Sequence, residues 1–203
     1  METPRKLLVL FAHPAIRRSR VNRRLVEAAR GLDGVTVNDL YEAYPDLDID
    51  VEKEQRLLVE HDVVVFQYPF YWYSTPAILK EWQDLVLKHG WAYGHDGHVL
   101  EQKLLLNVIT TGGSEETYCR QGSNHFTMRE LLAPLEQTAR LCGMRFLSPF
   151  VVHGTHALDD ETLERHAKDY RKVMIAFRDR RADLDVAGAA SRLNDDLNAL
   201  MGS

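Results

Sequence analysis

Five short runs of apolar residues recur along the chain, and each predicts a strand. The run from Val63 to Phe66 is continuous and β-branched, which is typical of a central parallel strand covered on both faces. Pro149 lies within the last run and places that strand near an edge of the sheet, because proline cannot donate to a strand ladder. The predicted strands span residues 6–12, 34–40, 63–66, 103–109 and 145–152.

The segments between these runs have apolar residues at helical spacing. Ser19, Asp50 and Asp159 stand where an N-cap is expected, and Ser74 or Thr75 offers a capping hydroxyl before Pro76. The predicted helices span residues 19–30, 51–60, 76–88, 128–141 and 159–181.

Strands and helices alternate, so the chain predicts one α/β domain over residues 1–181, with five parallel strands and helices on both faces. The tail, residues 182–203, is different. Leu193, Leu197 and Leu200 share one helical face, but flanks rich in Ala, Asn and Asp predict a weakly held helix or a disordered end.

Composition narrows the class of protein. A chain of 203 residues suits a single domain, and a net charge of −5 with mixed signs argues against nucleic acid as a partner. Cys119 and Cys142 fit neither a disulfide framework nor a metal site, which favours a reducing cytosol, and no metal is expected. No apolar stretch approaches the ~18 residues of a membrane span, so we expect a soluble protein.

An aromatic loop is the first candidate for binding chemistry. Four bulky residues follow the third predicted strand: Phe70, Tyr71, Trp72 and Tyr73. Loops at the carboxyl ends of parallel strands flank the ligand crevice of open α/β sheets, so this loop suggests a flat aromatic ligand. Aromatic residues that simply cover a loop are the alternative interpretation.

Two further loops follow predicted strands at the same edge. The helix that begins at Ser19 directs its N–H groups and positive end toward a phosphate, with Arg17, Arg18 or Arg20 to add charge. Neither GxGxxG nor a P-loop lysine motif is present, which leaves Ser19 and Asn22 as a polar cradle. The segment 110–113, TTGG, lets the backbone approach a ligand closely, or is a simple turn.

Four spaced motifs together resemble the flavodoxin-like NAD(P)H:quinone oxidoreductases, and within them the ancillary flavoproteins of glutathione-regulated potassium-efflux systems. The motifs are AHP followed by SxxN (12–22), DLYxxYPDxxID (39–50), QxPFYWYSTPAILKEWxDxVxxxGWAYG (67–94) and ITTGG (109–113). The resemblance covers residues 6–177. It implies a flavodoxin-like three-layer sandwich with strand order 2-1-3-4-5.

The resemblance also implies a cofactor and a reaction. FMN, or FAD as the alternative, would take hydride from NAD(P)H and pass it to a quinone in a ping-pong cycle. The residues that match the family's flavin-binding motifs are His13, Ser19, Arg20, Val21 and Asn22 for the phosphate, Phe70, Tyr71, Trp72 and Tyr73 for the ring, and Thr110, Thr111, Gly112 and Gly113 for its polar edge.

Larger quinone reductases of this fold carry a Tyr and then a His after TTGG, which implies catalytic roles for Tyr118 and His125. The resemblance further implies a cytoplasmic homodimer that docks on a potassium/proton antiporter at the inner face of the membrane. Three alternatives remain: a purely regulatory subunit of the efflux system, an azo- or nitro-reductase, and a one-electron flavodoxin-type carrier.

Overall fold

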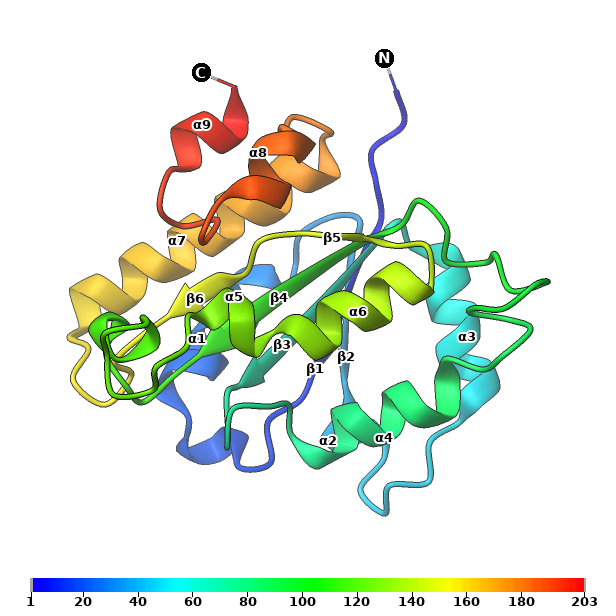
Figure 1. Ribbon diagram of the computed structural model, residues 1–203, viewed down its shortest axis with the longest axis horizontal. Coiled ribbons are helices and arrows are strands. Elements are labelled where there is room, and N and C mark those ends of the chain that lie inside the picture. Colours follow the sequence, from blue (N-terminus) through cyan, green and yellow to red (C-terminus); the bar gives the residue numbers. More distant parts are fainter. Residues whose placement is uncertain (1, 203) are drawn as a thin grey trace.

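The computed structural model describes residues 2–202 and has the predicted α/β architecture, a parallel sheet between two layers of helices (Figure 1). The strand order is β2-β1-β3-β4-β5, and the short β6 also pairs with β4, so the predicted order is confirmed. The strands are β1 (Leu7–Phe11), β2 (Val35–Asp39), β3 (Val63–Pro69), β4 (Leu104–Thr110), β5 (Arg145–Phe146) and β6 (Phe150–Val152).

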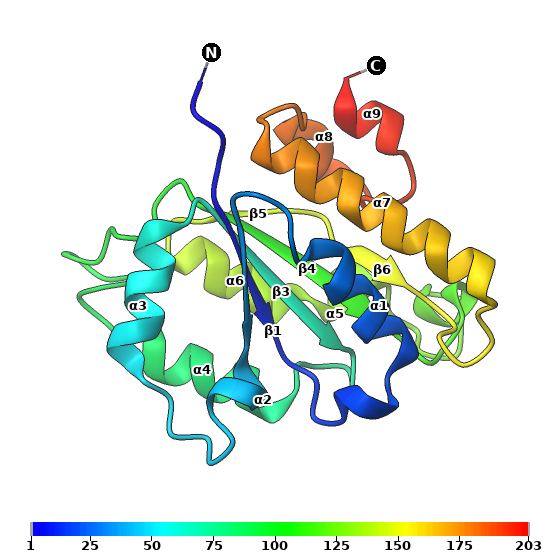
Figure 2. The same cartoon turned by 180° about the vertical axis from the view of Figure 1, so that it is seen from behind.

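Helices cover both faces of the sheet, as Figures 1 and 2 show from opposite sides. One layer contains α1 (Arg20–Ala29) and α7 (Asp160–Arg178). The other contains α2 (Leu40–Ala43), α3 (Val51–Glu60), α4 (Ala77–Val86), α5 (Met128–Leu131) and α6 (Ala133–Leu141). The loops carry the short 3-10 helices η1 (Ile16–Arg18) and η2 (Glu115–Tyr118), and the tail forms α8 (Leu184–Ala189) and α9 (Leu197–Met201).

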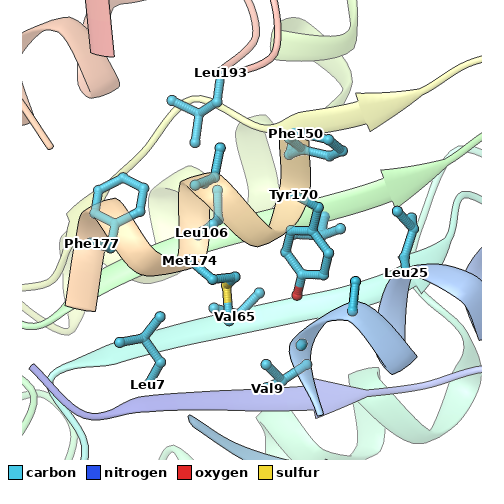
Figure 3. Packing of buried hydrophobic residues seen from close by; sticks show 14 of the residues in the cluster. Leu7, Val9, Leu25, Val65, Leu106, Phe150, Tyr170, Met174, Phe177 and Leu193 are labelled. Carbon is cyan, nitrogen blue, oxygen red and sulfur yellow. The ribbon is translucent and has the colours of Figure 1, made fainter. Parts of the chain in front are cut away.

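Alternation along the strands divides the core into two clusters. In β1, Leu7 and Val9 face α1 and α7, whereas Leu8 and Leu10 face the other layer, and all four are fully buried. Figure 3 shows the first cluster, in which side chains of β1, β3 and β4 meet Tyr170, Met174 and Phe177 of α7. Both faces of the central strands are therefore buried, as their apolar runs predict.

Two predicted elements are interrupted. The last predicted strand is divided into β5 and β6, because the N–H of Ser148 bonds to the carbonyl of Ala187 in the tail (2.7 Å) and Pro149 has no N–H to donate. The helix predicted over 128–141 ends after α5 and restarts as α6, with Pro134 in the first turn of α6.

The helix caps also test the sequence pattern. Ser19, Asp50 and Asp159 cap α1, α3 and α7 as predicted. The predicted capping hydroxyl before α4 is wrong, because Pro76 itself is the N-cap and no side chain caps that helix.

The tail packs along the β5–β6 edge of the sheet and onto α7. Leu193 and Leu200 are 2% and 1% exposed and belong to the cluster beneath α7. The side-chain amide of Asn194 accepts from the N–H of Val151 (3.1 Å) and donates to its carbonyl (2.9 Å), as a neighbouring strand would. The tail is thus joined to β6 by hydrogen bonds as well as by apolar packing.

Glu54 of α3 is a fully buried carboxylate with three side-chain donors around it. Asn38 donates to both of its oxygens (2.8 and 2.9 Å), Tyr44 to one (2.6 Å) and the Trp82 indole to the other (2.8 Å). These bonds join β2, α3 and α4. Removing the carboxylate would leave buried donors without an acceptor.

We expect Glu54→Ala to destabilise the protein by about 3 kcal/mol, the scale of a disrupted buried polar network. Urea unfolding measures this as a lower midpoint at unchanged slope. Glu52→Ala is the matched control on the same helix: its side chain is 88% exposed, and its effect should stay within about 0.5 kcal/mol. Equal midpoints for the two variants would contradict this account of the core.

Candidate functional site

A cleft of ≈ 570 Å³ lies where β1, β3 and β4 end. It brings together most of the residues that the sequence predicted to share this edge: His13, the segment 19–22, Phe70, Tyr71, Thr110 and Gly112. Their loops meet because the carboxyl ends of parallel strands lie along one edge of a sheet.

The start of α1 forms one end of the cleft. The Ser19 hydroxyl accepts from the backbone N–H of Asn22 (3.2 Å), while the N–H groups of Arg20 and Val21 have no intrahelical acceptor. The Asn22 amide is buried, donates to the Thr110 hydroxyl (2.7 Å), and leaves its oxygen Oδ1 without a partner. Free N–H groups at a positive helix end form an anion-binding site.

Two arginines lie at this end of the cleft, and they differ in whether their charge is already paired within the protein. The Arg20 guanidinium bonds to the Asp160 carboxylate and the Leu158 carbonyl at the start of α7, so its charge is already paired. Arg18 lines the cleft, is exposed, and has no side-chain partner among residues 2–202. Arg18 is therefore the better placed arginine for an anionic ligand.

His13 lies on the cleft wall in a defined protonation state. Its Nδ1 accepts from the N–H of Ala15 (3.0 Å), so a proton on the neutral ring belongs on Nε2. Burial lowers the pKa of His13 and keeps the ring neutral near pH 7. The ring lies edge-on to Tyr71, with centroids 6.0 Å apart.

The aromatic loop is divided between cleft and surface. Phe70 and Tyr71 line the cleft, whereas Trp72 is 93% exposed and the Tyr73 hydroxyl bonds to Asn124 (3.0 Å). Trp72 and Tyr73 both have positive φ values (50° and 62°), which turn the chain sharply away from the cleft wall.

Hydrogen bonds from β6 and the loop that follows it hold the turn after β4 in place. The N–H of Thr111 bonds to Val152 (2.9 Å) and the carbonyl of Gly113 accepts from Gly154 (2.9 Å). Within residues 2–202, the N–H groups of Gly112 and Gly113 have no acceptor. A Cβ on Gly112 would lie 3.0 Å from His156 Nε2, so a side chain at this position would require the His156 ring to shift.

Thr155 and His156 complete the cleft, and the sequence analysis assigned them no role. They follow β6, so the rule that predicted the other loops applies to them as well. Their loop was missed because no motif distinguishes it, although its position directly after a predicted strand was a usable indication.

Tyr118 and His125, the predicted catalytic pair, both lie outside the lining of the cleft, and Tyr118 lines a neighbouring pocket. The Tyr118 ring is half-buried, packs against Gly113, and lies 6.3 Å from the Phe70 ring and 5.3 Å from the His153 ring. Burial is the main cause of the raised pKa of Tyr118, which keeps its hydroxyl protonated at neutral pH. His125 is exposed at positive φ (60°) and is not part of the cleft.

His153 supports the turn from behind. The Thr111 hydroxyl donates to the Gly113 carbonyl (2.8 Å), so its oxygen accepts from His153 Nδ1 (3.0 Å), which must carry a proton. Burial, together with the charge of Arg192, lowers the pKa of His153 to about 4. A neutral imidazole thus holds the hydroxyl that fixes the turn.

An anion-binding helix start, a partly aromatic wall and a glycine turn with free N–H groups therefore share the edge of a doubly wound sheet. The chain belongs to the flavodoxin-like fold family, whose model matches residues 5–174.

Among curated relatives, the glutathione-regulated potassium-efflux system ancillary protein KefF of Enterobacter sp. (strain 638) is 43% identical over 173 residues, which are 85% of this chain and 97% of that protein.

Solved structures agree with this assignment. General stress protein 14 from Treponema denticola, solved in complex with FMN, is 37% identical with a TM-score of 0.81, over 85% of this chain and 99% of that chain. An NADPH-quinone reductase from P. pentosaceus is 32% identical with a TM-score of 0.76, over 83% and 96% of the two chains.

The neutral state of His153 predicts a dependence of stability on pH. The unfolded chain takes up a proton below about pH 6.5, whereas the folded chain resists it until about pH 4, so His153 lowers stability as the pH falls between these values. We expect His153→Gln to reduce the slope of unfolding free energy in this window, by at most about 1.4 kcal/mol per pH unit. Urea unfolding at several pH values measures it.

His98→Gln is the control, because Glu101 raises the pKa of the exposed His98. Its small contribution has the opposite sign and is lost as the pH rises through the folded pKa. If His153→Gln leaves the slope between pH 6.5 and pH 4 equal to that of the wild type, the neutral imidazole is ruled out.

Proposed function

We propose that the chain binds FMN in this cleft and acts as an NAD(P)H:quinone oxidoreductase. The observation that carries the proposal is the pairing of two sets of unsatisfied N–H groups, at the start of α1 and at Gly112, in one cleft, with the N–H of Gly113 next in the same turn. The first suits a phosphate, and the second suits the polar edge of a planar ring.

The residues present fit such a group. The buried Asn22 Oδ1 lacks a donor, and a hydroxyl-bearing chain between phosphate and ring could supply one. Gly112 and Gly113 carry no side chain, which lets a ligand approach the backbone of the turn closely. Phe70 and Tyr71 provide apolar surface on the wall between these polar ends.

When bound, FMN would accept a hydride from NAD(P)H and deliver its electrons to a quinone in a ping-pong cycle. The free N–H groups of Gly112 and Gly113 would stabilise negative charge without reorganising, because Thr111, Val152 and Gly154 already fix the turn. The protonated Tyr118 hydroxyl, whose ring lies beside Phe70 at the border of the cleft, could donate to a substrate oxygen there. The FMN complex of the Treponema relative supports FMN over FAD.

An anaerobic spectral titration tests this function. We expect purified protein to carry a flavin band that NADH or NADPH bleaches and that a quinone restores. The mass of the released cofactor decides between FMN and FAD. An oxidised band that neither nucleotide bleaches would overturn the proposal. If azo or nitro compounds restore the oxidised flavin band and quinones do not, the protein is a reductase of those compounds. If only a redox protein restores the band, the protein is a one-electron carrier.

We also propose a second role, as an ancillary subunit of a potassium/proton antiporter in the cytoplasm at the inner membrane face. The likeness to KefF supports it. Residues 2–202 contain no helix long and apolar enough to cross a membrane, so contact would run through the transporter.

Exposed aromatic side chains offer a surface for protein contact. The Tyr73–Asn124 hydrogen bond joins two loops that expose Trp72 and Phe126 (93% and 54% exposed). A patch of this kind on a small protein is typical of an interaction site. We propose that it pairs two copies of the chain in a homodimer, with the antiporter bound to the assembled pair.

Co-purification tests the ancillary role. A tagged full-length chain should co-elute with a detergent-solubilised glutathione-regulated potassium-efflux antiporter and raise its potassium efflux in vesicles. Trp72→Ser should weaken both effects if the patch assembles the active pair, whereas Leu141→Ser, at a residue 57% exposed on α6, serves as the matched surface control. Efflux and elution that do not respond to the chain would leave only the enzymatic role.

A further inference from the structure

The tail forms one wall of a second pocket, of ≈ 500 Å³, next to the candidate site. Tail residues 188–192 and Asp195 face Glu115, Tyr118 and His153 across it. The family model ends at residue 174, and 97% of the KefF relative aligns with 85% of this chain. The tail is therefore an addition to the shared fold that reaches the side chains behind the glycine turn.

Arg192 joins the tail to the segment that carries Tyr118. Its guanidinium bonds to Glu115 (2.6 Å) and also to Asp195, and its side chain is only 18% exposed. Glu115 is the first residue of η2 and Tyr118 is the last. The Arg192–Glu115 ion pair thus links the tail to a four-residue helix that places Tyr118 against Gly113.

η2 needs support of this kind. The side chain of its N-cap, Ser114, bonds to the side chains of Glu116 (3.0 Å) and Thr117 (3.3 Å) but caps no backbone N–H, and none of the η2 residues is fully buried. Segments with few buried contacts open at low free energy, so their position depends on contacts from outside. The Arg120–Glu130 pair holds the loop beyond η2, whereas Arg192 holds its first residue.

The same guanidinium acts on His153. The charged and titratable groups that face this imidazole are Arg192, Glu115, Asp195, His166 and Tyr118, whose ring lies 5.3 Å away. Burial is the main cause of the lowered pKa of His153, and Arg192 has the largest effect among the charged groups. A cation disfavours protonation of the ring. His153 in turn bonds to Thr111 of the glycine turn.

We infer that Arg192 is a positioning residue, through which the tail holds Tyr118 beside His153 at the border of the candidate site. The tail then supports the segment that packs against Gly113, next to the cleft. The kinetic consequence rests on the proposed oxidoreductase function, whereas the effect on η2 does not.

Hydrogen exchange of the full-length protein tests the anchor without reference to activity. We expect Arg192→Gln to raise amide exchange in residues 115–118 about fivefold, the scale of one partly exposed ion pair. Arg192→Lys should restore much of the protection. Arg145→Gln is the matched control, because it breaks the Arg145–Asp185 pair, which binds the same tail away from the site. Exchange in residues 115–118 that is equal in wild type and Arg192→Gln would overturn the inference.

NMR titration of His153 provides a second readout. Its pKa should rise in Arg192→Gln, because the facing cation is lost, and should stay unchanged in Arg145→Gln. A pKa that does not move in Arg192→Gln would remove His153 from the inference.

Kinetics then measure the consequence for the reaction. We expect Arg192→Gln to lower kcat/KM for a quinone about fivefold while flavin stays bound. Tyr118→Phe should also slow quinone turnover, and the double variant should be no worse than Tyr118→Phe alone, because both changes act through one side chain. Additive effects would contradict positioning of Tyr118 by Arg192. A wild-type protein without redox activity would refute the proposed function, while hydrogen exchange would still decide whether the tail anchors η2.

Discussion

The parallel alignment of β1, β3 and β4 is the constraint on which the site depends. Their backbone ladders continue beyond the strand ends: Ala12 bonds to Gln67, Phe70 to Thr110, and Thr111 to Val152. The first residues of three separate loops are thereby fixed at spacings set by the sheet itself. The sheet therefore brings together side chains that are distant in sequence. It fixes only the first residues of each loop, so the rest of the loop can vary in sequence and length.

A buried network of hydrogen bonds fixes helices α1 and α7 relative to the strands. Gln67 of β3 donates to the carbonyl of Asn22 in α1 (3.3 Å) and accepts from the hydroxyl of Tyr170 in α7 (3.2 Å). Asn22 in turn donates to Thr110 of β4. The helix that presents the anion-binding end therefore cannot shift relative to the strands without leaving buried polar atoms unsatisfied, which makes the cleft geometry a property of the core.

Pattern and local chemistry predicted most of the fold. The parallel strands, the Ser19 cap and the shared edge of the loops follow from pattern and local rules, and the strand order follows from the family resemblance. The pairing of Arg20 with Asp160 and the exposure of Trp72 follow from neither. Both features depend on which distant segment of the chain packs against the residue, and the neighbouring residues in the sequence do not reveal this. The same reason explains why His153 and Arg192 went unnoticed: each matters through a partner far away in the chain.

Asn194 shows how the sheet ends. The outer strand of an open sheet presents unpaired N–H and C=O groups, which can recruit a strand from another molecule and start aggregation. Here one amide side chain occupies both groups of Val151. Because a side chain has no ladder of its own to extend, it closes the edge at that residue without creating a new one. A segment beyond the matched family model thus covers this edge of the sheet at Val151.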